Sequence, residues 1–156
     1  MAESKASIKP QIEITYLNST NAPTFLQEKE VVDFLFTHLE KYGDPKPHIQ
    51  MAIDYACSSH KGKGGFVVIA RLKNEIVGAV VINQTGMSGY IPENILVYIA
   101  VNSEVRGMGI GHQLMQKAID LAKGDIALHV EADNPARKLY ERLGFTNKYL
   151  EMRLKK

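Results

Sequence analysis

The order of apolar and polar positions predicts a strand and two helices in the first part of the chain. In residues 11–17, Ile12, Ile14 and Tyr16 alternate with Glu13, Thr15 and Leu17. This alternation is typical of a strand at or near a sheet edge with one better-buried face. From Phe25 to Tyr42 apolar residues recur at helical spacing, and Gly43 follows them. A shorter second helix is expected after the Pro45-Lys-Pro47 break. The apolar positions of the two helices are Val31, Val32, Leu35, Phe36, Leu39, Ile49, Ala52, Ile53 and Ala56.

The middle of the chain predicts three strands. Phe66–Arg71 and Ile76–Asn83 are separated only by Leu72-Lys-Asn-Glu75, and we expect them to form a hairpin. After a polar connection comes Ile95–Val101, which is continuously apolar, rich in Val and Ile, and too short for a helix. This run predicts a strand buried on both faces.

The last part of the chain predicts a helix, a strand, a short helix and a final strand. The first helix carries an apolar stripe and ends at Gly124, and Ile126–Glu131 is the strand that follows it. Asn134 and Pro135 suit the N-cap and the first helical position of the short helix, which Gly144 closes. Thr146–Leu154 contains the final strand. The apolar stripe consists of Ile110, Leu114, Met115, Ala118 and Leu121.

Composition and charge add limits on compartment and partners. The 156 residues, 45% of them hydrophobic, suffice for one domain over residues 1–156, and we find no repeat or linker within it. The formal charge of +2 favours neither nucleic acid nor an anionic membrane as partner. We expect a cytoplasmic protein, because Met1–Pro10 lacks an apolar signal-peptide core and no run approaches a membrane span. Cys57 is the only cysteine, and the five histidines lack metal-ligand spacing, so no metal is expected.

A glycine-rich turn, residues 107–111, joins the strand Ile95–Val101 to the helix that follows. Its three glycines let the backbone bend in ways that a Cβ would forbid, and they leave N–H groups uncovered at the positive end of the helix. Such an arrangement binds anions, above all phosphates. Two nucleotide motifs do not match. The third glycine comes one residue too early for the dinucleotide fingerprint, and Gly111-His112 stands where a P-loop has Lys-Ser or Lys-Thr.

Two motifs resemble those of the GCN5-related N-acetyltransferase (GNAT) family. Arg106-x-x-Gly109-x-Gly111 resembles its acyl-CoA-binding signature, directly after Ile99-Ala-Val101. The segment from Asn134 to Phe145 contains Asn, Ala, Tyr and Gly-Phe in the order of the family's late motif, and the hairpin glycine Gly78 is also in place. The resemblance implies an α/β (α+β) acyl-CoA N-acyltransferase fold, with a central, mixed, mostly antiparallel twisted sheet and about four flanking helices.

This likeness is uneven along the chain. It covers residues 66–154 by motif, whereas residues 1–65 match only by their helix pattern. Few residues follow Gly144-Phe145, so the terminal strand pair of the family is shortened here. Because these variable parts shape the acceptor site in the family, the resemblance does not identify the acceptor.

The resemblance implies direct attack of an amine on acetyl-CoA, with the enzyme positioning the partners and polarising the carbonyl. The Ile99 N–H would face the thioester carbonyl, Val101 would pair with the pantetheine arm, and the amides of residues 107–112 would hold the pyrophosphate. Asn134 is either a helix N-cap or a partner of the CoA arm. Arg106 is either a phosphate contact or a surface residue, and for His112 we favour a solvated helix residue. The expected cofactor-binding residues are Ile99, Ala100, Val101, Arg106, Gly107, Met108, Gly109, Ile110, Gly111, His112, Asn134 and Ala136.

Two residues are expected to be catalytic. By resemblance Tyr140 protonates the departing thiolate, whereas its structural alternative is an aromatic residue at the edge of the core. Many family members carry a glutamate base on the central strand where this chain has Ile95. His129 is the best replacement, because an imidazole titrates near neutral pH and ribosomal-protein N-terminal acetyltransferases resemble it in position with a glutamate. The other candidates for the base are Glu131 and Glu93.

Two classes of function remain open from the sequence. The first is an acetyl-CoA-dependent N-acetyltransferase that acts on a small-molecule amine or a peptide N-terminus, as a monomer or homodimer. The second is a non-catalytic module that binds or senses acyl-CoA. Asn134 and Tyr140 favour the enzyme, whereas the missing strand glutamate favours the binding module.

Overall fold

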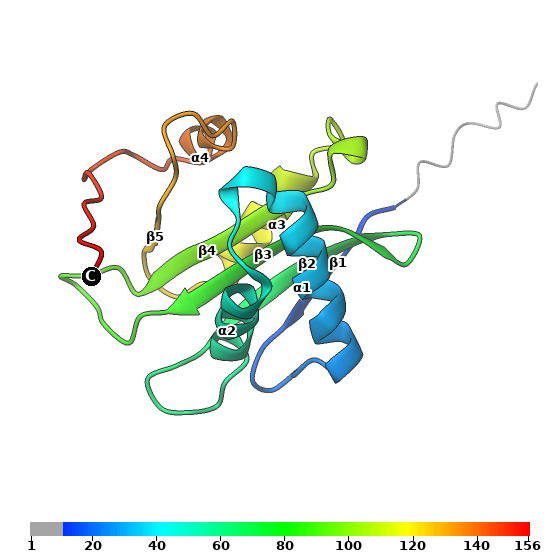
Figure 1. The fold of residues 1–156 in the computed structure, drawn as a ribbon, viewed down its shortest axis with the longest axis horizontal. Helices are drawn as coiled ribbons and strands as arrows, with labels where there is room; N and C mark the ends of the chain where they lie inside the picture. The colour runs from blue at the N-terminus through cyan, green and yellow to red at the C-terminus, as the bar shows by residue number, and fades with distance from the viewer. Residues whose placement is uncertain (1–10) are drawn as a thin grey trace, which may run out of the picture.

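The computed structural model describes residues 11–156, so the expectation for Met1–Pro10 lies outside the described residues. It contains one five-stranded sheet, in which the strands follow their order in the chain. The strands are β1 (Glu13–Leu17), β2 (Gly65–Leu72), β3 (Glu75–Gln84), β4 (Asn94–Val101) and β5 (Ile126–Leu128). β1 to β4 are antiparallel neighbours, and β5 runs parallel to β4 (Figure 1).

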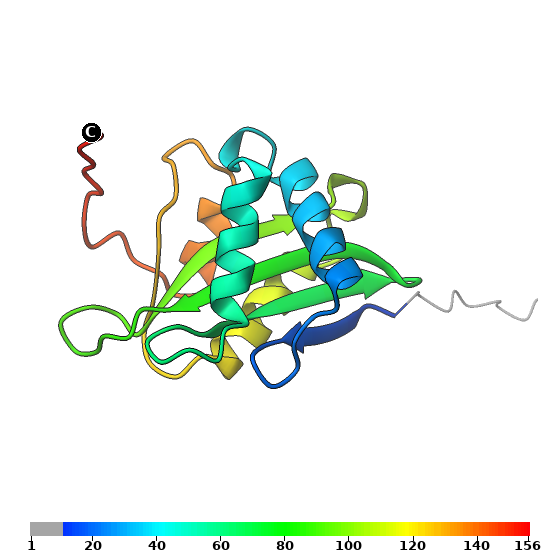
Figure 2. The same ribbon diagram turned by 60° about the horizontal axis from the view of Figure 1, so that its bottom comes forward.

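Four helices flank this mixed sheet, which confirms the fold class expected from the resemblance. They are α1 (Phe25–Leu39), α2 (Lys46–Ala56), α3 (Ile110–Leu121) and α4 (Arg137–Arg142). α1 and α2 cover one face of the sheet, and α3 covers the other (Figure 2). Within residues 11–156, no helix combines the length and hydropathy that crossing a bilayer requires.

β4 lies between the two layers of the core and shows a different burial from the one expected. Buried and half-buried residues alternate along it, so the expectation of burial on both faces is wrong. Tyr98 and Ala100 pack under α1 and α2, whereas Ile99 and Val101 are half-buried on the side of α3. The reason is that β5 pairs only with the first part of β4 and leaves the rest of this side uncovered.

The final strand expected within Thr146–Leu154 does not form. The segment has no strand partner, and its large apolar side chains are among the most exposed of the described residues, with Tyr149 79% and Leu150 85% exposed. An alternating pattern specifies which side chains share a face, whereas a strand also requires a neighbour that accepts its hydrogen bonds. The pattern is present here without the neighbour.

Three further elements differ at their ends. β5 covers only Ile126–Leu128 of the expected range Ile126–Glu131, because the chain leaves β4 after Leu128. The first helix ends at Leu39, and a 3₁₀ turn over Glu40–Tyr42 completes the range expected for it. The helix after the glycine turn ends at Leu121, before Gly124.

Gly78 on β3 provides a stability test of the packing between sheet and helix. A Cβ at this position would lie 2.7 Å from Leu114 Cδ1 and 3.0 Å from Ile110 Cγ2, and both residues are buried in α3. We therefore expect Gly78→Ala to lower the free energy of unfolding by about 1–3 kcal/mol through overpacking. Urea denaturation measures this change, and an unaltered midpoint would show that α3 moves aside freely.

Candidate active site

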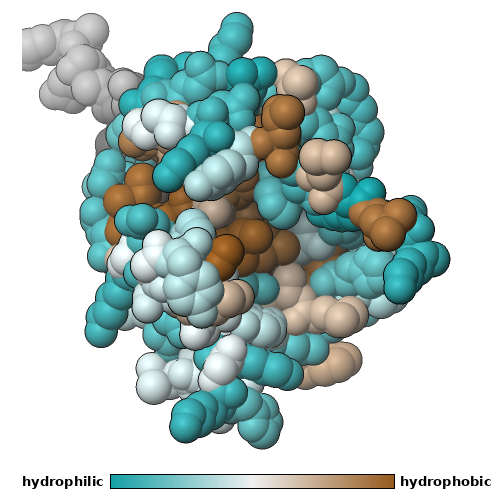
Figure 3. All heavy atoms as spheres, turned by 90° about the vertical axis from the view of Figure 1, so that its left-hand side faces the viewer, coloured by the Kyte–Doolittle hydropathy of each residue, from teal (hydrophilic) through white to brown (hydrophobic). Residues whose placement is uncertain are grey.

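The candidate site begins where β4 and β5 separate. The two strands pair only over Asn94–Leu96 and Ile126–Leu128, and β4 then continues alone on this side to Val101. Seen from the side of β5, the molecular surface shows apolar side chains gathered in a hollow (Figure 3). The second half of β4 thus offers a strand edge without a strand partner.

The backbone groups of Ile99 and Val101 face this gap. The N–H of Asn102, directly after β4, donates to the carbonyl of Val77 at 2.8 Å, so this pair is hydrogen-bonded toward β3. Hydrogen-bonded and non-hydrogen-bonded pairs alternate along an antiparallel ladder. Ile99 and Val101, which lie opposite Val80 and Gly78, are therefore in non-hydrogen-bonded positions and direct their N–H and C=O groups away from β3. Ala100, between them, directs its groups toward β3.

The turn that follows has the backbone expected for two of its three glycines. Gly107 has φ of 88° and Gly109 has φ of 75°, and a Cβ at either would meet no atom within 4 Å. Gly111 is different, because it lies inside α3 and its φ is not positive. A Cβ there would lie 3.2 Å from Leu139 Cδ2, so Gly111 permits close packing of α3 against α4 rather than a bend.

The N-terminus of α3 is uncapped. Gly109 is the N-cap and has no side chain to bond the first turn, which also contains no acidic residue. The N–H of Gln113 donates to the Gly109 carbonyl at 3.0 Å, so the N–H groups of Ile110, Gly111 and His112 precede the first intrahelical bond. These groups and the helix dipole make the end of α3 electropositive, and open space lies around Gly107 and Gly109.

Three side chains near this helix end lie in solvent. Arg106, Met108 and His112 are exposed. The fit to a diphosphate therefore rests on backbone N–H groups, with Arg106 as the cation nearest in sequence. A strand edge that can pair with an extended amide chain is thus followed by an amide-lined helix end that can bind phosphates.

Tyr140 lies on α4 and is 5% exposed. Its ring centroid is 5.8 Å from that of Phe145, whose N–H donates to the Tyr140 carbonyl at 3.0 Å. Burial raises the pKa of the Tyr140 phenol to about 12. The hydroxyl is therefore protonated at neutral pH and available as a donor.

Asn134 lies in the turn before α4 rather than at its N-cap. The helix begins at Arg137, so the expectation that Pro135 is the first helical residue is wrong. The side-chain oxygen of Asn134 accepts a hydrogen bond from the N–H of Ala136 at 2.9 Å, and the backbone carbonyl of Asn134 accepts one from the N–H of Arg137 at 3.1 Å. Asn134 and Ala136 are half-buried. With its oxygen engaged in this turn, Asn134 offers its amide nitrogen to a ligand.

The three candidates for the general base lie in two different parts of the chain. His129 and Glu131 are exposed in the segment after β5, so His129 is not on a strand as expected. Glu93 precedes β4, and its carboxylate accepts the N–H of Asp125 at 2.9 Å. That bond, followed by further backbone hydrogen bonds, lowers the pKa of Glu93. Glu93 and Ile99 are six positions apart along the strand, a distance of about 20 Å, so the structure does not bring Glu93 to the gap.

Two side chains near the gap were missed by sequence reasoning. The hydroxyl of Tyr98, directly before Ile99, donates to Asp44 Oδ2 at 2.5 Å. Burial, followed by this hydrogen bond and the charge of Asp44, raises the pKa of Tyr98. Asp44 lies in the connection between α1 and α2, 54 residues before Tyr98, and only its place beside the Pro45 break marks it in the sequence.

The connection between α1 and α2 is also tied to the segment between β5 and α4. Lys41 Nζ lies 3.2 Å from Asp133 Oδ2, and the Tyr42 hydroxyl donates to the Asp133 carbonyl at 3.3 Å. Asp133 directly precedes Asn134. These contacts hold residues 41–44 beside the part of the chain that follows β5.

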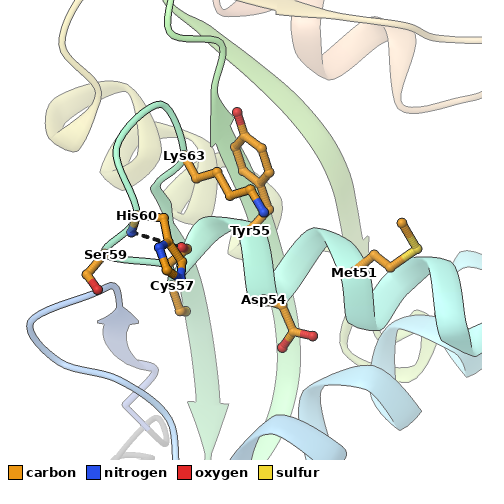
Figure 4. A pocket seen from close by; sticks show the side chains of 8 residues that line it. Met51, Asp54, Tyr55, Cys57, Ser59, His60 and Lys63 are labelled. Atoms are coloured by element: carbon orange, nitrogen blue, oxygen red, sulfur yellow. Dashed lines mark hydrogen bonds between the residues drawn. The ribbon is translucent and has the colours of Figure 1, made fainter.

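Two cavities lie elsewhere, along α2. One, of about 570 Å³, is at the C-terminal end of this helix and includes Cys57 and His60 (Figure 4). The other, of about 520 Å³, lies between α1 and α2. Burial, together with Glu28 and Asp54, raises the pKa of Cys57 to about 11, so the thiol is not a nucleophile at neutral pH. Neither cavity is lined by the residues expected from the sequence. Within residues 11–156, no group of three potential metal ligands is found.

Curated relatives that the chain matches are N-acetyltransferases. The chain is 34% identical over 85 residues to N-alpha-acetyltransferase 30 of Schizosaccharomyces pombe, an alignment that covers 51% of this chain and 57% of the relative. The chain spans little more than half the length of the curated relatives that it matches.

Solved structures share the fold. PH1933 from Pyrococcus horikoshii OT3 superimposes with a TM-score of 0.68 at 24% identity, over 91% of this chain and 93% of that one. An aminoglycoside N-acetyltransferase in complex with CoA superimposes with a TM-score of 0.66 at 16% identity, over 95% and 96% of the two chains. The model of the acetyltransferase (GNAT) family matches residues 29–145. With this match over most of its length, the chain belongs to the acetyltransferase (GNAT) family.

Proposed function

We propose that this protein is an N-acetyltransferase that transfers the acetyl group of acetyl-CoA to a primary amine of a small molecule or a peptide N-terminus. The single observation that supports this best is the unpaired edge of β4 at Ile99 and Val101, followed by the uncapped N-terminus of α3. Membership of the GNAT family supports the same reaction. A cytoplasmic location and a monomer or homodimer, without nucleic acid or membrane as partner, are parts of the proposal.

The backbone would do most of the binding. The N–H of Ile99 would polarise the thioester carbonyl, and Val101 would pair with the pantetheine arm as a strand does. The N–H groups of residues 107–112 would hold the pyrophosphate, with Arg106 as a further positive charge. Asn134 would donate from its amide nitrogen to the CoA arm. Bound acetyl-CoA supplies the activated acyl group, and the chain holds its carbonyl beside an acceptor.

The proton transfers fall to side chains. In the reaction the amine nitrogen bonds to the acetyl carbon, the carbon–sulfur bond breaks, and the nitrogen loses a proton. Tyr140, protonated at neutral pH, would give its proton to the leaving thiolate and regain one from solvent. His129 would take the amine proton, directly or through water.

The proposal is tested by measuring CoA release from acetyl-CoA in the presence of a panel of amines. The panel contains aliphatic monoamines, diamines, an aminoglycoside and short peptides with free N-termini. Amine-dependent release, with the acetylated product detected by mass spectrometry, is the expected result. Binding of acetyl-CoA without release with any amine would instead make the chain an acyl-CoA-binding module.

His129→Ala tests the proposed base. A positioned base contributes typically about 10²–10⁴-fold, but His129 is exposed and water can replace it, so we expect a loss in kcat of only about tenfold near pH 7. The affinity for acetyl-CoA should not change, because the imidazole lies outside the proposed CoA contacts. A wild-type kcat at saturating acceptor would remove His129 from the reaction. Glu131→Gln is the matched test of the other candidate base in the segment after β5.

A further inference from the structure

We propose that the Asp44 carboxylate, held by the hydroxyl of Tyr98, binds a cationic amine group of the acceptor beside the gap at Ile99. This inference rests on the proposed function and deepens it, since it assigns the acceptor side of the site and a charge to the acceptor. It also assigns a role to a pair of residues that the expected machinery leaves unused.

The first argument is position. Tyr98 and Ile99 are neighbours on β4, and their side chains lie on opposite faces of the sheet, Tyr98 with α1 and α2 and Ile99 with α3. Asp44 is therefore linked to β4 at the residue next to Ile99, through the Tyr98 side chain and its hydrogen bond of 2.5 Å. The α3 side of the gap leads to the proposed phosphate site. We therefore place the approach of the acceptor on the α1 and α2 side, where Asp44 lies.

The second argument is charge. Two other carboxylates in this part of the molecule are paired: Asp133 with Lys41 at 3.2 Å, and Asp33 with Lys46 at 3.0 Å. Within the described part of the chain, Asp44 forms no ion pair with a lysine, arginine or histidine. Its partner Tyr98 is a neutral donor. The side of Asp44 that faces solvent therefore keeps an uncompensated negative charge, which attracts cations.

The third argument is rigidity. Tyr98 is 7% exposed and packed in the core, so its hydroxyl is a fixed point for the carboxylate. The exposed contacts of Lys41 and Tyr42 with Asp133 join the same connection to the segment after β5. A carboxylate held by a buried donor loses less conformational entropy when a ligand arrives than a free one. An unconstrained surface carboxylate would give a weak and unspecific contact.

The chemistry of the acceptor fits this charge. An aliphatic amine with a pKa of about 10, like that of lysine, arrives almost entirely as an ammonium ion at neutral pH. A carboxylate collects this ion and holds it by a charge-assisted hydrogen bond. The bound ammonium is either a second cationic group of the same molecule or the group that will be acetylated, which loses one proton to His129 or water before its nitrogen attacks. Neutral aromatic amines would gain nothing from Asp44.

Asp44→Asn, Tyr98→Phe and the control Asp120→Asn, an exposed carboxylate on α3, test the inference. For each protein, the Kd for acetyl-CoA is measured by titration, and KM and kcat are measured with an aliphatic monoamine, a diamine of similar length and an aromatic amine. The melting temperature of each variant verifies that it is folded. Hydrogen bonds to charged groups contribute about 1.5–3 kcal/mol, so we expect Asp44→Asn to raise KM for the aliphatic amines by about ten- to a hundredfold.

The remaining values discriminate among the outcomes. The Kd for acetyl-CoA and the KM for the aromatic amine should stay unchanged, Tyr98→Phe should give a smaller rise in KM, and Asp120→Asn should match the wild type. If Asp44→Asn raises KM for both the monoamine and the diamine, Asp44 binds the reacting ammonium group. If it raises KM for the diamine alone, Asp44 binds the second ammonium group. Unchanged KM values for every amine in folded, active Asp44→Asn would overturn the inference and leave the proposed function intact. A wild-type protein that acetylates no amine would instead overturn the proposed function.

Discussion

Gly109→Val is expected to abolish the stabilisation of this protein by acetyl-CoA. A ligand at one hundred times its Kd stabilises the folded state by about 2.7 kcal/mol, which corresponds to a rise in melting temperature of about 5–10 °C for a chain of this size. Gly109 has φ of 75° and open space around the position of a Cβ, directly before α3. A valine there would fill the space next to the N–H groups that are proposed to hold the pyrophosphate, and it would strain the turn.

The strain itself needs a control, and the chain provides one. Gly89 also has φ of 75°, and a Cβ there would meet no atom within 4 Å, but it lies in the connection before β4. Gly89→Val should therefore lower the melting temperature of the free protein by a similar amount and keep the shift with acetyl-CoA. Thermal denaturation of both variants with and without the ligand measures the difference. If folded Gly109→Val keeps its acetyl-CoA affinity, the phosphate site is not at this turn.

Tyr140→Phe is expected to lower the maximal rate by roughly ten- to a thousandfold, with little change in the Kd for acetyl-CoA. The substitution keeps the ring, its contact with Phe145 and the packing of α4, and removes only the hydroxyl. The loss would thus appear in kcat, because protonation of the thiolate matures only in the transition state. The lower limit reflects protonation by water, since a thiol with a pKa of about 8.5 is already a tolerable leaving group.

Steady-state kinetics with an identified acceptor and a CoA titration test this expectation. Leu139→Val, in which the neighbouring α4 side chain is shortened, is a useful comparison, because it perturbs packing and leaves the Tyr140 hydroxyl in place. Equal maximal rates for Tyr140→Phe and the wild type would exclude Tyr140 as the proton donor and leave it a packing role at the edge of the core.

The unit from β4 through α3 could be predicted from the sequence because its signals are local. A β-branched run, glycines at positions of positive φ and an apolar stripe of period 3.6 lie within a few tens of residues. The uncapped start of α3 follows from Gly109 alone. The role of Gly111 could not be predicted in this way, since it depends on the approach of Leu139 from α4.

Other features depend on contacts that no local pattern contains. Nothing in Thr146–Leu154 itself shows that β5 ends at Leu128 and offers this segment no hydrogen bonds. The orientation of the Glu93 side chain depends on the hydrogen bond that its carboxylate accepts from the N–H of Asp125, which follows α3. Asp44 meets Tyr98 across 54 residues, because α1 and its 3₁₀ turn happen to end over β4. Contacts of this kind appear only once the layers have assembled.

The contact of Gly111 with Leu139 has a consequence for how the two halves of the site communicate. Gly111 lies in the first turn of α3, and Leu139 directly precedes Tyr140 on α4. The helix end proposed to hold a diphosphate thus packs so closely on the helix of Tyr140 that a Cβ at Gly111 would lie 3.2 Å from Leu139 Cδ2. We therefore expect the effects of substitutions at Gly111 and at Tyr140 to be non-additive, because groups that share a packed neighbour are energetically coupled.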